Sequence, residues 1–155
     1  MLLEDQDRTK WKRLEIEEGV RLVEAALHMQ RPGTYQIQAA IAAVHAEART
    51  AAETDWPQIV LLYDELMRCD PTPVVELNRA VAVSFADNPG LGLRLLERIE
   101  RDGTLDNYAP FHLARAGMFR RLGFNQETRA CYERALPFAE NAQVRRFIER
   151  RLRSS

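Results

Sequence analysis

The stretch YAPFHLARAGMFRRLGFNQETRACYERALPFA, residues 108–139, decides the fold. Its apolar residues recur with the period of an amphipathic helix on both sides of the turn Leu122-Gly123-Phe124. Residues 108–122 therefore predict one helix, and residues 125–139 predict a second. Ala116 is a small residue at the point where two helix backbones must approach each other. The stretch as a whole predicts a helical hairpin.

The same pattern recurs earlier in the chain. Aligning the second helix of each pair matches Tyr63 with Leu96 and Tyr132, at intervals of 33 and 36 residues. A repeat of about 34 residues made of two helices is typical of tetratricopeptide domains. Such hairpins cannot bury their apolar faces alone, so they stack into a solenoid whose usual function is binding. The register predicts a core that includes Tyr63, Leu96, Ala116, Phe119, Tyr132 and Ala135.

Helical periodicity extends along the whole chain, and strand signals are nearly absent. The first predicted helix carries Trp11 and Leu27 and ends before Arg31-Pro32-Gly33. The others are expected at residues 35–48, 56–69, 74–85, 91–101, 108–122, 125–139 and 142–152. The sequence thus predicts an all-α, tetratricopeptide-like helical-hairpin solenoid of about eight helices with a C-terminal capping helix. We expect residues 1–155 to form a single domain.

Composition limits the possible environments of the chain. Lys and Arg number 22 against 23 Asp and Glu, so no overall field attracts nucleic acid or a membrane. The apolar run Ile37 to Ala46 is too short to span a bilayer, and the N-terminus has no secretory signal. We expect a cytoplasmic protein that contacts no membrane. Cys69 and Cys131 are expected to be reduced thiols in or near the core.

No catalytic motif stands out. His28, His45 and His112 fall on three different predicted helices, without the paired spacing of a metal site. Phosphate-binding loops and nucleophile motifs are also missing. The sequence therefore predicts no catalytic, cofactor-binding or metal-binding residues, and a protein that is not an enzyme.

Polar residues on the inner helices of a solenoid are candidates for protein contacts, because those helices line its concave surface. These candidates are Gln36, Gln38, His45, Asn78, Arg79 and Arg115. One alternative function is therefore a free-standing tetratricopeptide adaptor, in which Asn78 and its basic neighbours hold a peptide carboxylate on the concave face. The arginine-rich last helix, residues 142–152, is expected to be a polar cap rather than a nucleic-acid contact.

Particular strings resemble one family. LEDQDRTKW at 3–11, PGTYQIQAAIAAVHAEA at 32–48, TDW at 54–56, LYD at 62–64 and LNRAVA at 77–82 are similar to the C-terminal extension of certain bacterial extracytoplasmic-function sigma factors. The resemblance covers essentially the whole chain. In that family, N-terminal sigma regions 2 and 4 bind promoter DNA and core RNA polymerase, and a tetratricopeptide-like domain follows them.

The resemblance implies that this chain is the regulatory domain of a longer sigma factor of the sigma-70 type. Its partners would be sigma regions 2 and 4 of the parent chain, with core RNA polymerase or a regulatory protein as further partners. DNA would be contacted by the N-terminal part and not by this domain. The string Asp5-Gln6-Asp7-Arg8, followed by Trp11, lies beside the junction and has the composition of an interface. We expect Asp5, Gln6, Asp7, Arg8 and Trp11 to contribute contacts, although helix capping by Asp5 or Asp7 is the simpler alternative.

Overall fold

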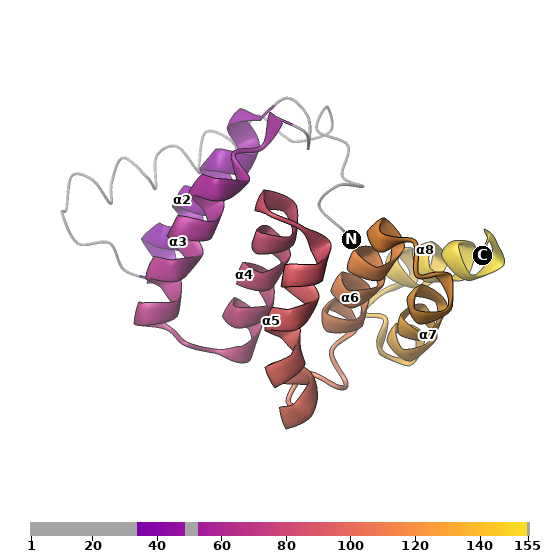
Figure 1. Cartoon of the computed structure of the whole chain (residues 1–155). Helices are drawn as coiled ribbons and strands as arrows, with labels where there is room; N and C mark the ends of the chain where they lie inside the picture. Colours follow the sequence, from indigo (N-terminus) through magenta and orange to yellow (C-terminus); the bar gives the residue numbers. More distant parts are fainter. Residues whose placement is uncertain (1–33, 49–52, 155) are drawn as a thin grey trace. The chain divides into compact units, whose positions relative to one another are not determined.

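The computed structural model describes residues 34–48 and 53–154. This part of the chain is helical, without strands, as the sequence predicted (Figure 1). Its elements are α2 (Thr34–Glu47), α3 (Trp56–Cys69), α4 (Pro73–Ala86), α5 (Pro89–Asp102), α6 (Ala109–Leu122), α7 (Asn125–Ala135), the 3-10 turn η4 (Leu136–Phe138) and α8 (Ala142–Ser154). The first predicted helix lies outside the described residues.

The contacts group the chain into two compact units, and the boundary between Ala82 and Val83 falls inside α4. The first unit contains α2, α3 and most of α4. The second contains the end of α4, α5 to α8 and η4. That these units make the one domain expected from the sequence stays a prediction.

In the first unit α2 and α3 pack side by side (Figure 1). Alternating small and large residues of α2, such as Ala39 and Ile41, are buried, as are Ile59 and Leu66 of α3. The start of α3 is fixed by Asp55, whose side chain accepts a hydrogen bond from the backbone N–H of Gln58 at 3.1 Å. This N-cap satisfies one of the donors that the first turn of a helix leaves unpaired.

In the second unit α6 and α7 form the helical hairpin that residues 108–139 predicted. Gly123 ends α6 in the left-handed region, with φ at 81°, and its N–H bonds back to the last turn of α6. That turn brings α7 back along α6, and α8 then packs against α7. The shared core is built from Leu113, Ala116, Cys131, Tyr132, Ala135 and Ile148.

Most of the core positions that the repeat alignment predicts are buried. Leu66, Ile99 and Ala135 occupy matching positions, and each is at most 1% exposed. Leu96, Ala116 and Tyr132 of the predicted core are buried as well. Tyr63 and Phe119, by contrast, are only half-buried. Phe119 lies in the last turn of α6, beside the exposed ring of Phe124, and packs against the edge of the core.

Two expectations were wrong. The predicted helix 125–139 ends at Ala135, and residues 136–138 form η4 instead. Pro137 explains the change, because its ring clashes with a helical carbonyl and it has no N–H to donate. Cys69 is exposed at the end of α3 rather than in the core, whereas Cys131 is buried and both thiols are free. Among the described helices, none is long and apolar enough to span a bilayer.

Candidate functional site

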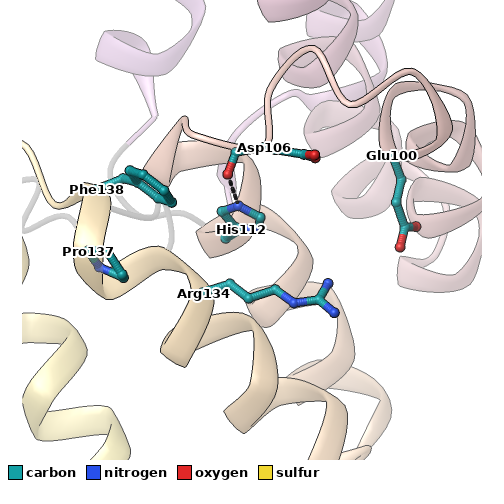
Figure 2. A pocket seen from close by; sticks show the side chains of 6 residues that line it. All are labelled: Glu100, Asp106, His112, Arg134, Pro137 and Phe138. Carbon is teal, nitrogen blue, oxygen red and sulfur yellow. Dashed lines mark hydrogen bonds between the residues drawn. The ribbon is translucent and has the colours of Figure 1, made fainter.

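A hollow of about 520 Å³ opens on the second unit (Figure 2). It is lined by Glu100 from α5, Asp106 from the turn after α5, His112 from α6, Arg134 from α7, and Pro137 and Phe138 from η4. Four consecutive elements therefore contribute side chains to one surface. The lining combines two carboxylates, a guanidinium group, an imidazole and two apolar rings.

The wall beside His112 is fixed by the turn that follows α5. Gly103 ends α5 in the left-handed region, with φ at 69°, and its N–H bonds to the carbonyl of Ile99. A left-handed residue at this position reverses the chain, and glycine adopts it without strain. The turn then presents the backbone carbonyl of Asp106 to the ring of His112, as Figure 2 shows.

His112 is 4% exposed and is held in one orientation. Its Nε2 lies 2.6 Å from the carbonyl oxygen of Asp106, and a carbonyl can only accept, so Nε2 carries the donated proton. In the neutral ring Nδ1 is then an acceptor. This buried Nδ1 has no hydrogen-bond partner in the described structure.

Glu100 belongs to an ion pair that joins α5 to α6. The Nη2 of Arg115 lies 3.2 Å from Oε1 of Glu100, with the arginine largely buried and the carboxylate about half exposed. The guanidinium carbon of Arg115 also lies 5.7 Å from the ring centres of Phe111 and Phe119. The charge of Arg115 is thus already engaged by a carboxylate and two aromatic faces.

Cys131 lies close enough to these groups to be influenced by them. Burial raises the pKa of the Cys131 thiol, and the positive charges of Arg115 and Arg134 oppose that rise only in part. The thiol therefore stays protonated at neutral pH and is a poor nucleophile. Its packing in the α6–α7–α8 core agrees with a structural role.

Arg134 and the η4 turn form the open side of the hollow. Arg134 is exposed and has no ion-pair partner within the described residues. In Figure 2 its side chain extends past His112 toward the side where Glu100 lies. Phe138 and Pro137 lie at the opposite edge, and the Phe138 ring is 36% exposed. The hollow thus offers a cation and an apolar edge to a ligand.

The contact residues predicted from sequence are divided between the two units. Gln36 is half-buried and Gln38 is exposed on α2, while His45 is buried edge-on against Trp56, with ring centres 5.2 Å apart. His45 is only 6% exposed, so a partner protein cannot readily reach it. Asp5, Gln6, Asp7, Arg8 and Trp11 lie outside the described residues.

The three residues of the predicted carboxylate clamp, Asn78, Arg79 and Arg115, differ in exposure and in their partners. Asn78 is exposed on α4. Arg79 donates through Nε to Asp64 at 2.5 Å, so its charge is already paired within the first unit. Arg115 belongs to the second unit and is engaged with Glu100. Of the three clamp residues, Asn78 alone is an exposed polar group with no ion-pair or hydrogen-bond partner in the described structure.

The hollow itself was missed from the sequence. From the sequence, His112 is only one of three histidines on different helices, and Glu100, Asp106, Arg134 and Phe138 are not among the predicted contact residues. The available signals were local: Gly103 after an amphipathic helix marks a reversal, and Pro137 ends a helix so that Phe138 turns outward. Among the described residues, no group of three or more His, Cys, Asp or Glu side chains is arranged to hold a metal ion.

The chain is similar in sequence to one curated protein. An uncharacterized protein of Rhizobium meliloti (strain 1021) is 45% identical over 153 residues, which is 98% of this chain and 36% of that protein. The chain therefore spans about a third of the length of the relative that it matches. No family model matches the chain, and no solved structure matches it either.

Proposed function

We propose that this chain is the non-catalytic regulatory domain of an extracytoplasmic-function sigma factor, and that it modulates transcription initiation through protein contacts. The observation that carries the proposal is the match of nearly the whole chain to about a third of a longer protein. A sequence of this kind therefore occurs as one segment of a larger polypeptide. That arrangement is what the resemblance of strings such as LNRAVA at 77–82 implies.

The chemistry of the second unit supports binding rather than catalysis. The Cys131 thiol is kept protonated by burial, and Arg115 is committed to Glu100 and two aromatic rings. His112 has one nitrogen fixed on a backbone carbonyl. What remains available is a hollow with a cation and an apolar edge, which is the composition of a recognition surface.

In the proposed sigma factor, regions 2 and 4 of the parent chain are the first partners, with core RNA polymerase or a regulatory protein as further partners. The Asp5-Gln6-Asp7-Arg8 string lies nearest to the junction in sequence, so it is the proposed intramolecular contact. The domain would act in the cytoplasm, where transcription takes place.

Transcription in vitro tests the proposal. The assay uses core RNA polymerase and two proteins. One carries sigma regions 2 and 4 followed by this domain, and the other carries the sigma regions alone, with residues 1–155 removed. We expect the truncation to change promoter transcription several-fold. Ala116→Arg in the longer chain should reproduce the truncation, because it disrupts the α6–α7 contact, whereas Ala130→Arg on the exposed side of α7 should not. Equal transcription from all four proteins would rule out the regulatory role.

The alternative function, a free-standing peptide adaptor, gains one specific observation. Arg134 and Phe138 line the same hollow, and together they suit a peptide with an apolar residue and a carboxylate. Titration with a library of peptides carrying a free C-terminal carboxylate tests this adaptor. Loss of binding on Arg134→Gln would locate the peptide in the hollow, and loss on Asn78→Ala would locate it on α4. Absence of any bound peptide contradicts the adaptor.

A further inference from the structure

The last helix, α8, has the largest excess of positive charge among the described helices. Over residues 142–154, α8 holds five arginines and a single acidic residue, Glu149. The whole chain has 22 basic and 23 acidic residues. α6 also holds three arginines and no acid, but its Arg115 pairs with Glu100 and its Arg121 donates to Ser84.

The arginines of α8 fall on one side of it. At 100° per residue, Arg145, Arg146, Arg150 and Arg153 lie within an arc of about 140°, and Arg145 and Arg153 are about 12 Å apart along the axis. All four are exposed, and none has an ion pair or side-chain hydrogen bond within the described chain. These four residues form the basic face of α8. The opposite side of α8 is anchored by Ile148, which is fully buried.

Helix stability accounts for only part of the basic face. Arg151 is explained by packing, because its guanidinium carbon lies 5.2 Å from the ring centre of Phe147. Arg153 lies in the last turn, where the helix dipole favours a cation. Arg145 and Arg146 lie near the start of α8, where the dipole disfavours positive charge. Elsewhere, arginines such as Arg98 and Arg129 pair with an acid one turn away on their own helix.

We propose that the basic face of α8 binds the phosphate backbone of duplex DNA. A protein partner fits less well, because the exposed residues of α8 include no large apolar side chain to form the centre of an interface. Single-stranded nucleic acid also fits less well, since it needs open aromatic platforms. Phe147 is half-buried, edge-on to Tyr132 and covered by Arg151.

The choice of DNA as the polyanion rests on the proposed function, which brings the domain to promoter complexes. It departs from two expectations from the sequence, that only the N-terminal sigma regions contact DNA and that residues 142–152 form a polar cap rather than a nucleic-acid contact. The contact is electrostatic and independent of base sequence, because arginines on phosphates position a protein without reading bases. Its role would be to hold the domain against DNA that the sigma regions have already selected.

Fluorescence anisotropy of this 155-residue chain with a labelled mixed-sequence DNA duplex tests the proposal. If the basic face neutralises up to four phosphates, log K should fall with log salt with a slope of about −3.6. Between 50 and 200 mM salt the affinity should then fall about 150-fold. The assay contains neither polymerase nor sigma regions, so its failure is distinguishable from a failure of the transcription test.

Three variants make the test specific. Arg145→Gln/Arg146→Gln/Arg150→Gln should lower affinity at 50 mM salt at least tenfold and reduce the slope to about −0.9. The control Arg94→Gln/Arg98→Gln/Arg101→Gln makes the same charge change on α5 and should bind as the parent does. Glu149→Gln removes the acid within the basic face and should raise affinity. Circular dichroism checks that each variant is folded.

The proposal is overturned if the parent does not bind duplex DNA at 50 mM salt, or if the two triple variants bind equally. A polyglutamate peptide that displaces the duplex as well as unlabelled DNA does, at equal charge concentration, would also overturn it. That result would assign the basic face to an acidic protein. A duplex RNA that binds more tightly than the DNA would overturn the choice of DNA.

Discussion

A single methyl group sets how closely two helices of the second unit approach. Ala116 is completely buried in the contact between α6 and α7. Ala116→Arg should destabilise the second unit by more than about 3 kcal/mol, because the core has no room for the side chain and no partner for its charge. Ala130→Arg, on the exposed side of α7, should change stability by less than about 0.5 kcal/mol. Urea denaturation followed by circular dichroism measures both, and equal midpoints would show that the assigned contact is wrong.

The two cysteines should react very differently. Cys69 is exposed, while Cys131 is 3% exposed and burial raises the pKa of its thiol. With an excess of a disulfide reagent at pH 8, Cys69 should be modified first and Cys131 only as the second unit opens. The rate of thiol modification, measured by the leaving group that the reagent releases, is compared in the variants Cys69→Ser and Cys131→Ala, each of which keeps one thiol. Rapid modification of Cys131 in the folded Cys69→Ser variant would contradict the prediction.

The raised pKa of the Cys131 thiol also affects the stability of the protein at alkaline pH. A thiol whose pKa is raised in the folded state holds its proton longer there than in the unfolded chain. Its contribution to stability is therefore complete below the ordinary pKa of 9.0 and is lost as the pH rises above it. The free energy of unfolding should fall above pH 9 in the parent, and it should fall less steeply in Cys131→Ala. Parallel curves for the two proteins would exclude the linkage.

At the level of helices and turns, the sequence predicted where most helices begin and end, but it did not predict the hollow. Periodicity and the residues that end helices are local signals, so α3 and α6 begin and end within one residue of their predicted limits. The hollow needs four elements to meet, and nothing local in the sequence specifies that Glu100, His112 and Phe138 will share a surface. Local signals were also overridden at α7, where Pro137 shortened a run that periodicity alone would continue.

One arginine closes the end of α4. The carbonyl of Ser84 lies in the last turn of α4, where carbonyl groups have no partner within the helix. Arg121 of α6 donates to that carbonyl at 2.9 Å and to the Ser84 hydroxyl at 3.2 Å, and its guanidinium carbon lies 4.2 Å from the centre of the Phe85 ring. This arrangement needs the planar fork of arginine, which a lysine cannot reproduce.

Arg121→Lys should therefore lower the free energy of unfolding by roughly 1–3 kcal/mol, although the charge is kept. Arg101→Lys, an exposed arginine in the last turn of α5, provides the control and should have little effect. Chemical denaturation of both variants gives the comparison. If Arg121→Lys unfolds at the same urea concentration as Arg101→Lys, the contact with Ser84 contributes nothing to stability.

At the scale of the whole molecule, the question is what the N-terminal string does in a longer protein. Asp5→Asn/Asp7→Asn should leave the stability of the 155-residue chain unchanged if these carboxylates contact the sigma regions, because the partner is absent there. In the longer chain the same change should lower transcription. A helix cap gives the opposite pattern, with about 1–2 kcal/mol lost by the chain alone and normal transcription. Asp87→Asn/Asp102→Asn is the charge-matched control.

The boundary between the two compact units lies within α4, not in a loop, and this decides how the gene can be recombined. A chimaera of two homologous chains with its crossover between Ala82 and Val83 would combine two parental sequences within one helix. The last turn of that helix would then come from one parent and its remainder from the other. A crossover at Asp87 and Asn88, after α4 has ended, keeps each helix in its own parental context. Shuffled libraries should accordingly retain folded clones at residues 87–88 and lose them at the unit boundary.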